Sequence, residues 1–287
     1  MKFLEAFASG ADPIVSFEVF PPKTEKAEEQ LERVLPRLLS LKPAFMTVTY
    51  GALGSTQART IEIASRIKKD FSCEVASHLT CVSSSREEID RILDLLTESG
   101  IENIVALRGD PPSGEGAFVA PEGGFHHASE LVAHIKQTGR FGIAVAGYPE
   151  KHIEAPDLDT DLAYLKGKVE AGGDIVITQL FYDNARFFAF EKKLRSLGVT
   201  APVVPGLLPI QSFSQVRRIT SLCGAKLPPE LETELEAAGE DRERVEEVGN
   251  RWAVAQCREL LDHGVPGLHF YVLNRAAPME KIMAELG

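Results

Sequence analysis

The stretch ENIVALRGDPP, residues 102–112, decides the fold class, because an apolar run ends there in polar residues that a buried strand does not need. Residues 104–107 (IVAL) are continuously apolar, which is typical of a strand buried on both faces of a parallel sheet. The run ends at Arg108, Gly109 and Asp110, and the two prolines that follow cannot donate to a sheet ladder. Polar residues at the carboxyl ends of strands are how a (β/α)8 barrel builds an active site.

The same pattern recurs in five other places along the chain, where apolar runs end at Glu18, Thr49, His78, Tyr148 and Gln179. The runs follow one another at roughly thirty-residue spacing, about one βα unit each. We therefore predict an α/β fold, a (β/α)8 TIM barrel, forming a single domain over residues 1–287. Its strands are expected at 14–20, 45–50, 74–80, 103–108, 142–148, 175–180, 203–208 and 267–273.

Amphipathic patterns between these runs predict the helices of the barrel, at 25–39, 60–69, 86–98, 129–138, 159–171 and 184–197. Extra helices are expected between the seventh and eighth strands, at 214–223, from Pro228 and Pro229 onward, and at 241–263. The Gly/Pro-rich segment 111–125 follows the fourth strand. Its composition fits a ligand lid and a plain surface connection equally well.

Composition excludes several classes of function. The 287 residues are 44% hydrophobic and 25% charged, and 31 Lys and Arg against 42 Asp and Glu give a formal charge of −11. An acidic protein is a poor partner for nucleic acid or an anionic membrane, and no stretch approaches 18 uninterrupted apolar residues. The four cysteines form no C-x-x-C pair, and the start of the chain shows no signal-type apolar region, so we expect reduced thiols and a cytoplasmic protein.

Familiar ligand motifs are also missing from the sequence. It has no G-x-G-x-x-G after a strand, no P-loop, no G-x-S-x-G elbow and no H-E-x-x-H pair, and no strand ends in a lysine. We therefore expect neither a Rossmann nucleotide site nor a Schiff-base aldolase, and no metal site.

Glu18 is the strongest candidate for acid–base chemistry. Alternation along the first strand places it on one face with Ser16 and Phe20, pointing into the barrel. Burial would raise the pKa of such a carboxyl group and make it a proton donor near neutral pH. The alternative is a carboxylate paired with a structural arginine or lysine.

The other polar residues at strand ends each admit a structural explanation. Arg108 and Asp110 suit a polar ligand, but an ion pair that closes the barrel rim would look the same. His78 fits a hydrogen-bonded structural histidine as well as a catalyst. Asp161 and Lys168 are seven residues apart on one helix face, where a surface ion pair would explain both.

Taken together, the motifs closely resemble the methylenetetrahydrofolate reductase family in its short bacterial form. The resemblance covers nearly the whole chain, and its strength lies in eight motifs that occur in the family's order and spacing. They are VSFEVFPP, FMTVTYGALGSTQART, SHLTC, IVALRGDPP, YPEKH, ITQLFYD, VVPGLLPI and HFYVLNRA.

This resemblance implies a (β/α)8 barrel that binds FAD non-covalently and reduces 5,10-methylenetetrahydrofolate to 5-methyltetrahydrofolate, which supplies methyl groups for methionine synthesis. NADH or NADPH would deliver the electrons in a ping-pong reaction. The family also implies a homo-oligomer, a dimer or a tetramer.

Individual roles follow from the resemblance, position by position. Glu18 matches the general acid that protonates the folate nitrogen N10. Asp110 matches the carboxylate beside the flavin and the pterin, and Gln179 the amide that contacts folate and nicotinamide in turn. Matches to FAD-contacting positions are Thr49, His78, Arg108, Gly109, Asp110, His127, Ala128, Tyr148, His152, Asp161 and Lys168. Matches near the folate are Glu18, Gln179, Gln215, Ile219 and Arg275.

The chain departs from the family pattern at His127, Tyr164, Gly167 and Ile219, which affects the expected contacts to FAD and folate. Two other functions stay open on the sequence. One is a different flavin-dependent barrel of the proline-dehydrogenase type, which would need a pair of arginines near the eighth strand where only Arg275 stands. The other is a non-catalytic ligand-binding barrel, which would be colourless when purified.

Overall fold

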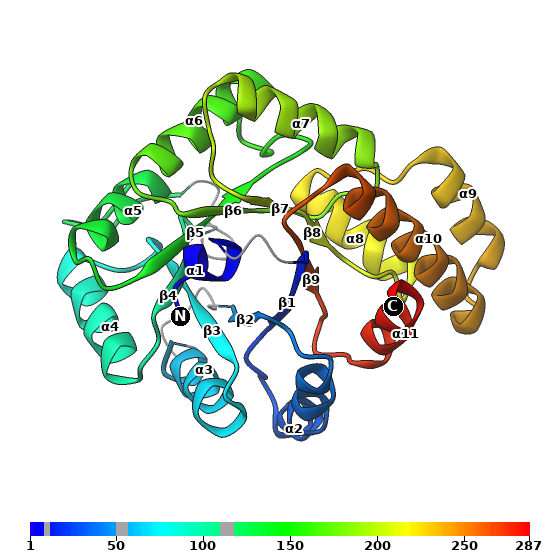
Figure 1. Cartoon of the computed structure of the whole chain (residues 1–287), viewed down its shortest axis with the longest axis horizontal. Helices are drawn as coiled ribbons and strands as arrows, with labels where there is room; N and C mark the ends of the chain where they lie inside the picture. Colours follow the sequence, from blue (N-terminus) through cyan, green and yellow to red (C-terminus); the bar gives the residue numbers. More distant parts are fainter. Residues whose placement is uncertain (9–11, 50–56, 110–117) are drawn as a thin grey trace.

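A parallel sheet rolled into a barrel and surrounded by helices forms the centre of the protein (Figure 1). The computed structural model describes residues 1–8, 12–49, 57–109 and 118–287. Within them the strand order is β7-β6-β5-β4-β3-β2-β1-β9-β8, with every pairing parallel. The predicted α/β barrel is therefore confirmed. The strands are β1 (Ile14–Val19), β2 (Phe45–Val48), β3 (Glu74–Thr80), β4 (Asn103–Leu107), β5 (Gly142–Gly147), β6 (Ile175–Thr178), β7 (Val203–Val204), β8 (Gly206–Leu207) and β9 (Gly267–Tyr271).

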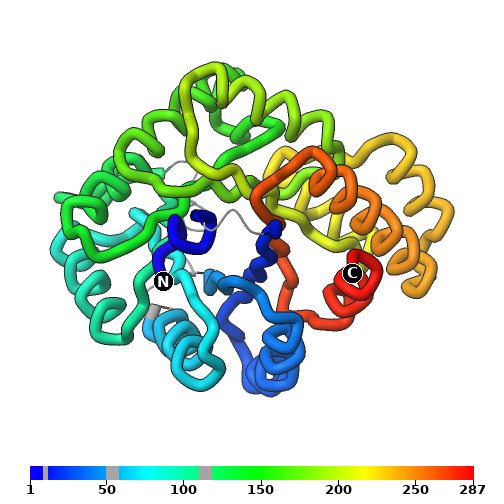
Figure 2. The backbone as a smooth tube through the Cα atoms, viewed as in Figure 1, coloured from blue at the N-terminus to red at the C-terminus, as the bar shows by residue number. Residues whose placement is uncertain are grey.

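The helices lie where the amphipathic patterns predict them, with two that the sequence analysis did not predict, α1 and α11. Helices α8, α9 and α10 separate β8 from β9, as expected, and lie together on one side of the ring (Figures 1 and 2). The helices are α1 (Phe3–Ala8), α2 (Glu25–Ser40), α3 (Gln57–Phe71), α4 (Arg86–Glu98), α5 (Ala128–Gln137), α6 (Leu158–Glu170), α7 (Asn184–Ser196), α8 (Phe213–Cys223), α9 (Pro229–Ala238), α10 (Arg242–His263) and α11 (Ala277–Leu286).

Local sequence explains where these helices begin and end. Ser85 caps α4 by accepting from the Glu88 backbone N–H, while the Glu88 side chain accepts from the Ser85 backbone N–H, which forms a capping box. Gly100, at φ +74°, follows the end of the same helix. Along α2 the apolar positions Leu31, Val34 and Leu35 are buried against the barrel.

The predicted seventh strand, 203–208, is wrong in one respect, because it is split into β7 and β8 at Pro205. β7 pairs with β6 and β8 pairs with β9, so this short segment changes partners and closes the barrel. Side chains complete the closure, since the Gly206 N–H donates to Thr178 Oγ1 at 2.9 Å and the Tyr271 hydroxyl donates to the Thr178 carbonyl at 2.6 Å. The prolyl ring and these side-chain bonds interrupt an otherwise regular ladder.

At the amino-terminal ends of the strands, the barrel interior is filled by apolar side chains and covered by α1. Phe3 packs edge-on against Phe45 at a centroid distance of 5.0 Å, among inward-facing residues of β3 to β7. In contrast, Phe17 and Val19 of β1 point outward and are fully buried under the helices. As far as the described residues define the interior, a ligand of this barrel therefore has room toward the carboxyl ends of the strands.

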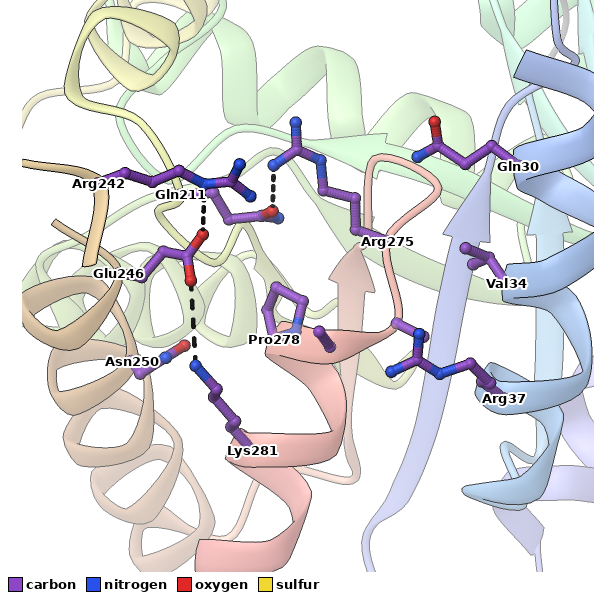
Figure 3. A pocket seen from close by; sticks show the side chains of 12 residues that line it. Gln30, Val34, Arg37, Gln211, Arg242, Glu246, Asn250, Arg275, Pro278 and Lys281 are labelled. Atoms are coloured by element: carbon purple, nitrogen blue, oxygen red, sulfur yellow. Dashed lines mark hydrogen bonds and ion pairs between the residues drawn. The ribbon is translucent and has the colours of Figure 1, made fainter. Parts of the chain in front are cut away.

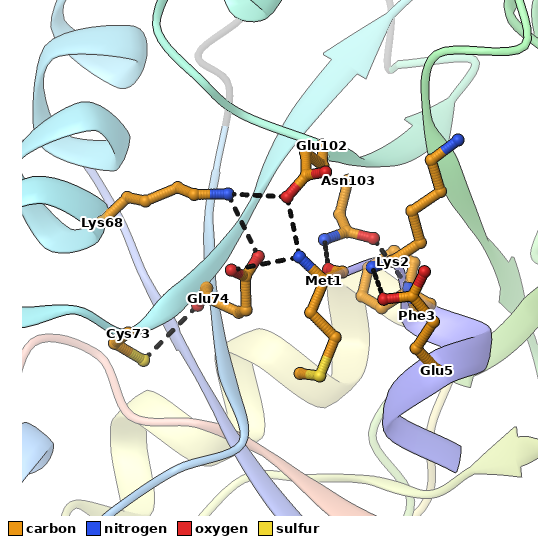
Figure 4. Close-up of polar contacts among 9 residues, drawn as sticks. All are labelled: Met1, Lys2, Phe3, Glu5, Lys68, Cys73, Glu74, Glu102 and Asn103. Carbon is orange, nitrogen blue, oxygen red and sulfur yellow. Dashed lines mark hydrogen bonds and ion pairs between the residues drawn. The ribbon is translucent and has the colours of Figure 1, made fainter. Parts of the chain in front are cut away.

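A network of charges holds α1 in this position (Figure 4). The Met1 α-amino group lies 2.7 Å from Glu102 Oε2 and 3.3 Å from Glu74 Oε1, and Lys68 contacts both carboxylates. Hydrogen bonds from the amino group and from Lys68 lower the pKa of Glu102 to about 2. Asn103 adds two hydrogen bonds to the backbone at the start of α1.

Among the residues that the structure describes, no helix is long and apolar enough to cross a membrane.

Gly206 provides a test of the barrel closure. A Cβ at this position would lie 2.0 Å from the Thr178 carbonyl oxygen, whereas a Cβ on the helical Gly167 would meet nothing within 4 Å. We expect Gly206→Ala to lower the free energy of unfolding by about 1–3 kcal/mol. The matched control Gly167→Ala should raise it by about 0.5–1 kcal/mol. Urea unfolding followed by circular dichroism measures both, and equal effects of the two changes would contradict this account of the closure.

Candidate active site

Glu18 lies inside the barrel, where β1, β2, β3 and β9 bring four polar side chains together. Its carboxylate accepts a hydrogen bond of 3.2 Å from Thr47 Oγ1. His78 Nε2 lies 3.1 Å from Glu18 Oε2, and His269 Nε2 lies 3.7 Å from the same oxygen. Neither contact has the geometry of a hydrogen bond, and the one with His269 is also too long, so the attraction is mainly electrostatic. Among the described residues, the contacts of Glu18 are thus histidines and a threonine, instead of the arginine or lysine of the structural alternative.

The expected rise in the pKa of Glu18 is wrong. Burial does raise this pKa, but the charge of His78 and the close contacts with His269 and His78 outweigh burial and lower it to about 2. The physical reason is the neighbouring strands. Alternation along β1 shows that the carboxylate points inward, but it does not show which side chains β3 and β9 place beside it.

His269 is a site residue that the sequence analysis missed. It is completely buried, its Nδ1 lies 2.8 Å from Ser16 Oγ, and its ring meets that of Tyr271 edge-on at 5.2 Å. The HFYVLNRA motif contains both residues, and a period of two along 267–271 would have placed them on the inward face with Glu18. Burial also raises the pKa of the Tyr271 hydroxyl well above its usual range.

A second group of polar residues, which we call the cationic cluster, lies at the carboxyl ends of β4 and β5. Its members are Arg108, Tyr148, His152, Glu154 and Lys168. Arg108 forms a bidentate ion pair with Glu154, with N···O distances of 2.6 and 2.8 Å. The Tyr148 ring contacts the His152 ring edge-on at 4.7 Å, and Lys168 Nζ lies 5.9 Å from the Tyr148 ring centroid.

Asp161 and Lys168 are not a surface ion pair, which corrects the structural explanation given for them. Asp161 is buried and accepts a 3.0 Å hydrogen bond from the His152 backbone N–H. Lys168 turns inward and donates to the Ala146 carbonyl. Burial lowers the pKa of Lys168 to about 8, although the negative charge of Asp161 acts in the opposite direction. The charged form of a lysine that has lost its hydration in this way is stabilised by an anion placed beside it.

Other predicted cofactor positions surround the same rim. Thr49 follows β2, and its N–H donates to the Val19 carbonyl. Gly109 has φ +86°, and a Cβ there would lie 2.9 Å from Val82 Cγ1, so only glycine fits. His127 is the exposed N-cap of α5, and Ala128 is its first residue. Asp110 lies outside the described residues.

The predicted folate positions are distributed over β6, α8 and the end of β9. Gln179 is tied to β5 through its N–H, which donates to the Gly147 carbonyl at 2.7 Å. Gln215 and Ile219 lie one turn apart on α8, the first exposed and the second half-buried. Arg275 Nη1 donates to Gln211 Oε1 at 2.8 Å. The structure therefore brings Glu18 and His78 into contact and brings the members of the cationic cluster together. In the described part of the chain, Gln215 and Ile219 form no hydrogen bond or ion pair with either group.

Comparison with known proteins identifies the family. The family model of methylenetetrahydrofolate reductase matches residues 3–287. The chain belongs to this family. A methylenetetrahydrofolate reductase (NADH) 1 of Arabidopsis thaliana is 44% identical over 283 residues, which is 95% of this chain and 48% of the plant protein. The 5,10-methylenetetrahydrofolate reductases of Pectobacterium carotovorum and Escherichia coli are 40% and 38% identical, each over 95% of this chain and 90% of the relative.

The chain thus spans about half the length of the plant relatives and most of the length of the bacterial ones. Solved structures of low identity share the barrel. A Clostridium thermocellum protein that binds two copies of 5-methyl-5,6,7,8-tetrahydrofolic acid matches with a TM-score of 0.64 at 18% identity, over 98% of this chain and 96% of that one. At this identity the likeness shows the fold of the chain and nothing more.

The low pKa of Glu18 predicts a pH dependence of stability. Because the pKa in the folded state, about 2, lies below the ordinary value of 4.5, the ionised carboxylate stabilises the fold above pH 4.5. This contribution, on the order of 3 kcal/mol, is lost as the pH falls from 4.5 toward 2. The difference in free energy of unfolding between the native chain and Glu18→Gln should therefore shrink between pH 5 and pH 3. Urea titrations at each pH measure it, and a difference that stays constant with pH would disprove the pairing with His78 and His269.

Proposed function

We propose that this chain is an FAD-dependent reductase that converts 5,10-methylenetetrahydrofolate to 5-methyltetrahydrofolate with electrons from NADH or NADPH, by a ping-pong reaction. The observation that carries the proposal is the Glu18 carboxylate, set between His78 and His269 at the open end of a barrel whose sequence belongs to this family. Membership of the family supplies the reaction class, and the half-buried Glu18 carboxylate supplies a group suited to it.

The residues present fit FAD at the carboxyl ends of β3 to β5. Arg108 and Lys168 bring two cations into a chain of net charge −11, as a pyrophosphate requires. Thr80 Oγ1 is buried without a hydrogen-bond partner among the described residues, and a polar ligand atom would satisfy it. When bound, FAD would supply two-electron hydride chemistry between the nicotinamide and the one-carbon unit of folate.

Glu18 would act on the folate. Opening of the methylene bridge leaves N10 in need of a proton and places positive charge on the one-carbon unit. The ionised Glu18 carboxylate would stabilise that positive charge, and it would pass a proton on to N10. His78, whose Nε2 lies 3.1 Å from Glu18 Oε2, is the nearer imidazole, and a small rotation would align it to deliver that proton. Gln179, at the end of β6, is placed for amide hydrogen bonds to whichever substrate is bound.

The test of the proposal is the visible absorption spectrum of the purified chain after incubation with FAD. We expect flavin bands that bleach anaerobically with NADH or NADPH and return when methylenetetrahydrofolate is added. NADH and NADPH are tested separately, because the plant relatives are named for NADH whereas the proposal leaves the choice between the two open. Protein that stays colourless after incubation with FAD would refute the proposal in favour of a non-catalytic barrel.

Glu18→Gln separates the two half-reactions in the same experiment. Bleaching by the nicotinamide nucleotide should stay within about threefold of the native rate, because no proton is transferred to N10 in that step. Recovery on addition of methylenetetrahydrofolate should slow by at least about a hundredfold. Equal losses in both half-reactions would rule out a role of Glu18 that is specific to folate.

The ion pair of Arg108 with Glu154 predicts opposite effects of two neutral substitutions on FAD affinity. If Arg108 binds the pyrophosphate, Arg108→Gln removes a charge-assisted contact and should weaken binding by about tenfold or more. Glu154→Gln removes a carboxylate that competes with the ligand and should strengthen binding by about twofold to fivefold. Quenching of flavin fluorescence measures both dissociation constants. Weaker binding in both variants would mean that the ion pair supports the site and does not compete with FAD.

A further inference from the structure

A cavity of about 380 Å³ lies between the first turns of α7 and α9 and one face of α10. It belongs neither to the Glu18 site nor to the cationic cluster. Its volume falls within the roughly 300–1,000 Å³ that is common for small-molecule sites. The polar side chains that define it are Asp183 and Asn184 at the start of α7, Glu230 of α9, and Trp252, Gln256 and Glu259 of α10.

Negative charge dominates this cavity. The carboxylates of Asp183, Glu230 and Glu259 line it, and no lysine or arginine does so in the described part of the chain. Asp183 lies 3.6 Å from Arg186, whereas the other two have no ion-pair partner among the described residues. Two carboxylates that are not neutralised within the protein indicate a cationic ligand.

The net charge of the chain, −11, does not explain these carboxylates, because a cavity that shares α10 has the opposite charge (Figure 3). That cavity lies between α2, α10 and α11, and Glu246 supplies the single carboxylate among its described lining residues. The cations that line it are Arg37, Arg242, Arg275 and Lys281. The sign of the charge is thus a local property of each cavity.

Asn184 is a second, independent sign of a ligand in the acidic cavity. This residue is only 6% exposed, and its Nδ2 donates to the Gln256 carbonyl at 3.1 Å and to Glu259 Oε2 at 2.6 Å. These two acceptors fix the orientation of the amide, because the reverse orientation would place its oxygen against theirs. Oδ1 is therefore a buried acceptor without a hydrogen-bond partner among the described residues, and a donor on a ligand would satisfy it.

Hydrogen bonds hold the walls of this cavity in place. Trp252 Nε1 donates to the Tyr182 carbonyl at 3.1 Å, and Gln256 Nε2 donates to the Phe181 carbonyl at 3.0 Å. The Tyr182 hydroxyl in turn donates to the Leu208 carbonyl at 3.0 Å. The half-buried indole of Trp252 is thus a fixed aromatic surface, and a preformed site spends little of the binding free energy on ordering.

We propose that this cavity binds a guanidinium group carried on a short alkyl stem. A guanidinium is planar and always charged, and its five N–H donors can bond a carboxylate and the Asn184 amide oxygen together. It also stacks on aromatic faces such as that of Trp252, whereas an ammonium ion is more strongly hydrated. The first turn of α9 does not favour an anion, because Glu230 already complements the helix dipole there. The inference does not rest on the proposed function.

The test uses Trp252, the single tryptophan of the chain, as a reporter. Fluorescence and titration calorimetry of the full chain are compared for butylguanidinium, for butylammonium, which has the same alkyl group, and for butyrate, which has the opposite charge. We expect saturable quenching and binding heat with butylguanidinium. Binding of butylammonium should be weaker by about threefold or more, and butyrate should not bind.

Substitutions locate the binding in the cavity. Glu259→Gln and, separately, Glu230→Gln should weaken binding of butylguanidinium by about threefold to tenfold, since exposed ion pairs are individually weak. Asn184→Ala should also weaken it, without a change of charge. The matched control is Glu236→Gln, which makes the same charge change at an exposed position of α9 outside the cavity and should keep the native affinity.

The absence of saturation in both fluorescence and calorimetry would overturn the guanidinium site. Equal affinities for butylguanidinium and butylammonium, or an affinity that survives both glutamate substitutions, would do the same. A Gly-Arg-Gly peptide with blocked ends distinguishes two sources of the group. Binding as tight as that of butylguanidinium supports an arginine side chain of a polypeptide as the occupant, and weaker binding supports a free guanidinium compound. None of these measurements involves folate or a nicotinamide nucleotide, so the proposed function is decided separately.

Discussion

The pairing of β1 with β9 is the constraint on which the rest of the structure depends. It joins the beginning and the end of the chain, with Ser16 opposite His269 and Glu18 opposite Tyr271. Only this register places a carboxylate of the first strand beside an imidazole of the last. Because side chains alternate along a strand, a slip of β1 by one residue would turn Glu18 out of the barrel into the outer apolar layer. Glu18 would then no longer lie beside His269.

The same register determines the chemistry of the carboxylate. In an apolar pocket Glu18 would be neutral, but two imidazoles and a threonine hydroxyl keep it ionised. A carboxylate that is charged at rest is suited to stabilising positive charge first and to relaying a proton second. The electrostatics of this family member are thus set by side chains from β3 and β9, strands that lie far from β1 in the sequence.

Much of the fold was readable from the sequence, because parallel strands and their helices leave strong local patterns. The extent of α4 and the insertion of α8 to α10 were predicted from such patterns. The division of the seventh strand was not, since it arises where Thr178 and Tyr271 meet Gly206 across the barrel. The sequence also did not predict the low pKa of Glu18 or the inward direction of the Lys168 side chain. Both depend on partners that only the folded chain brings together.

The divided seventh strand has a consequence for motion. Two residue pairs join β6 to β7 and two join β8 to β9, whereas each other neighbouring pair of strands shares four or five. Segments held by few backbone hydrogen bonds open at the lowest free energy. The ring of backbone hydrogen bonds around the barrel is therefore weakest at the divided seventh strand, where the Tyr271 hydroxyl bridges to the Thr178 carbonyl. Gln179 follows β6 and Tyr271 ends β9 on the two sides of this place, so an opening here would widen the barrel where the candidate active site lies.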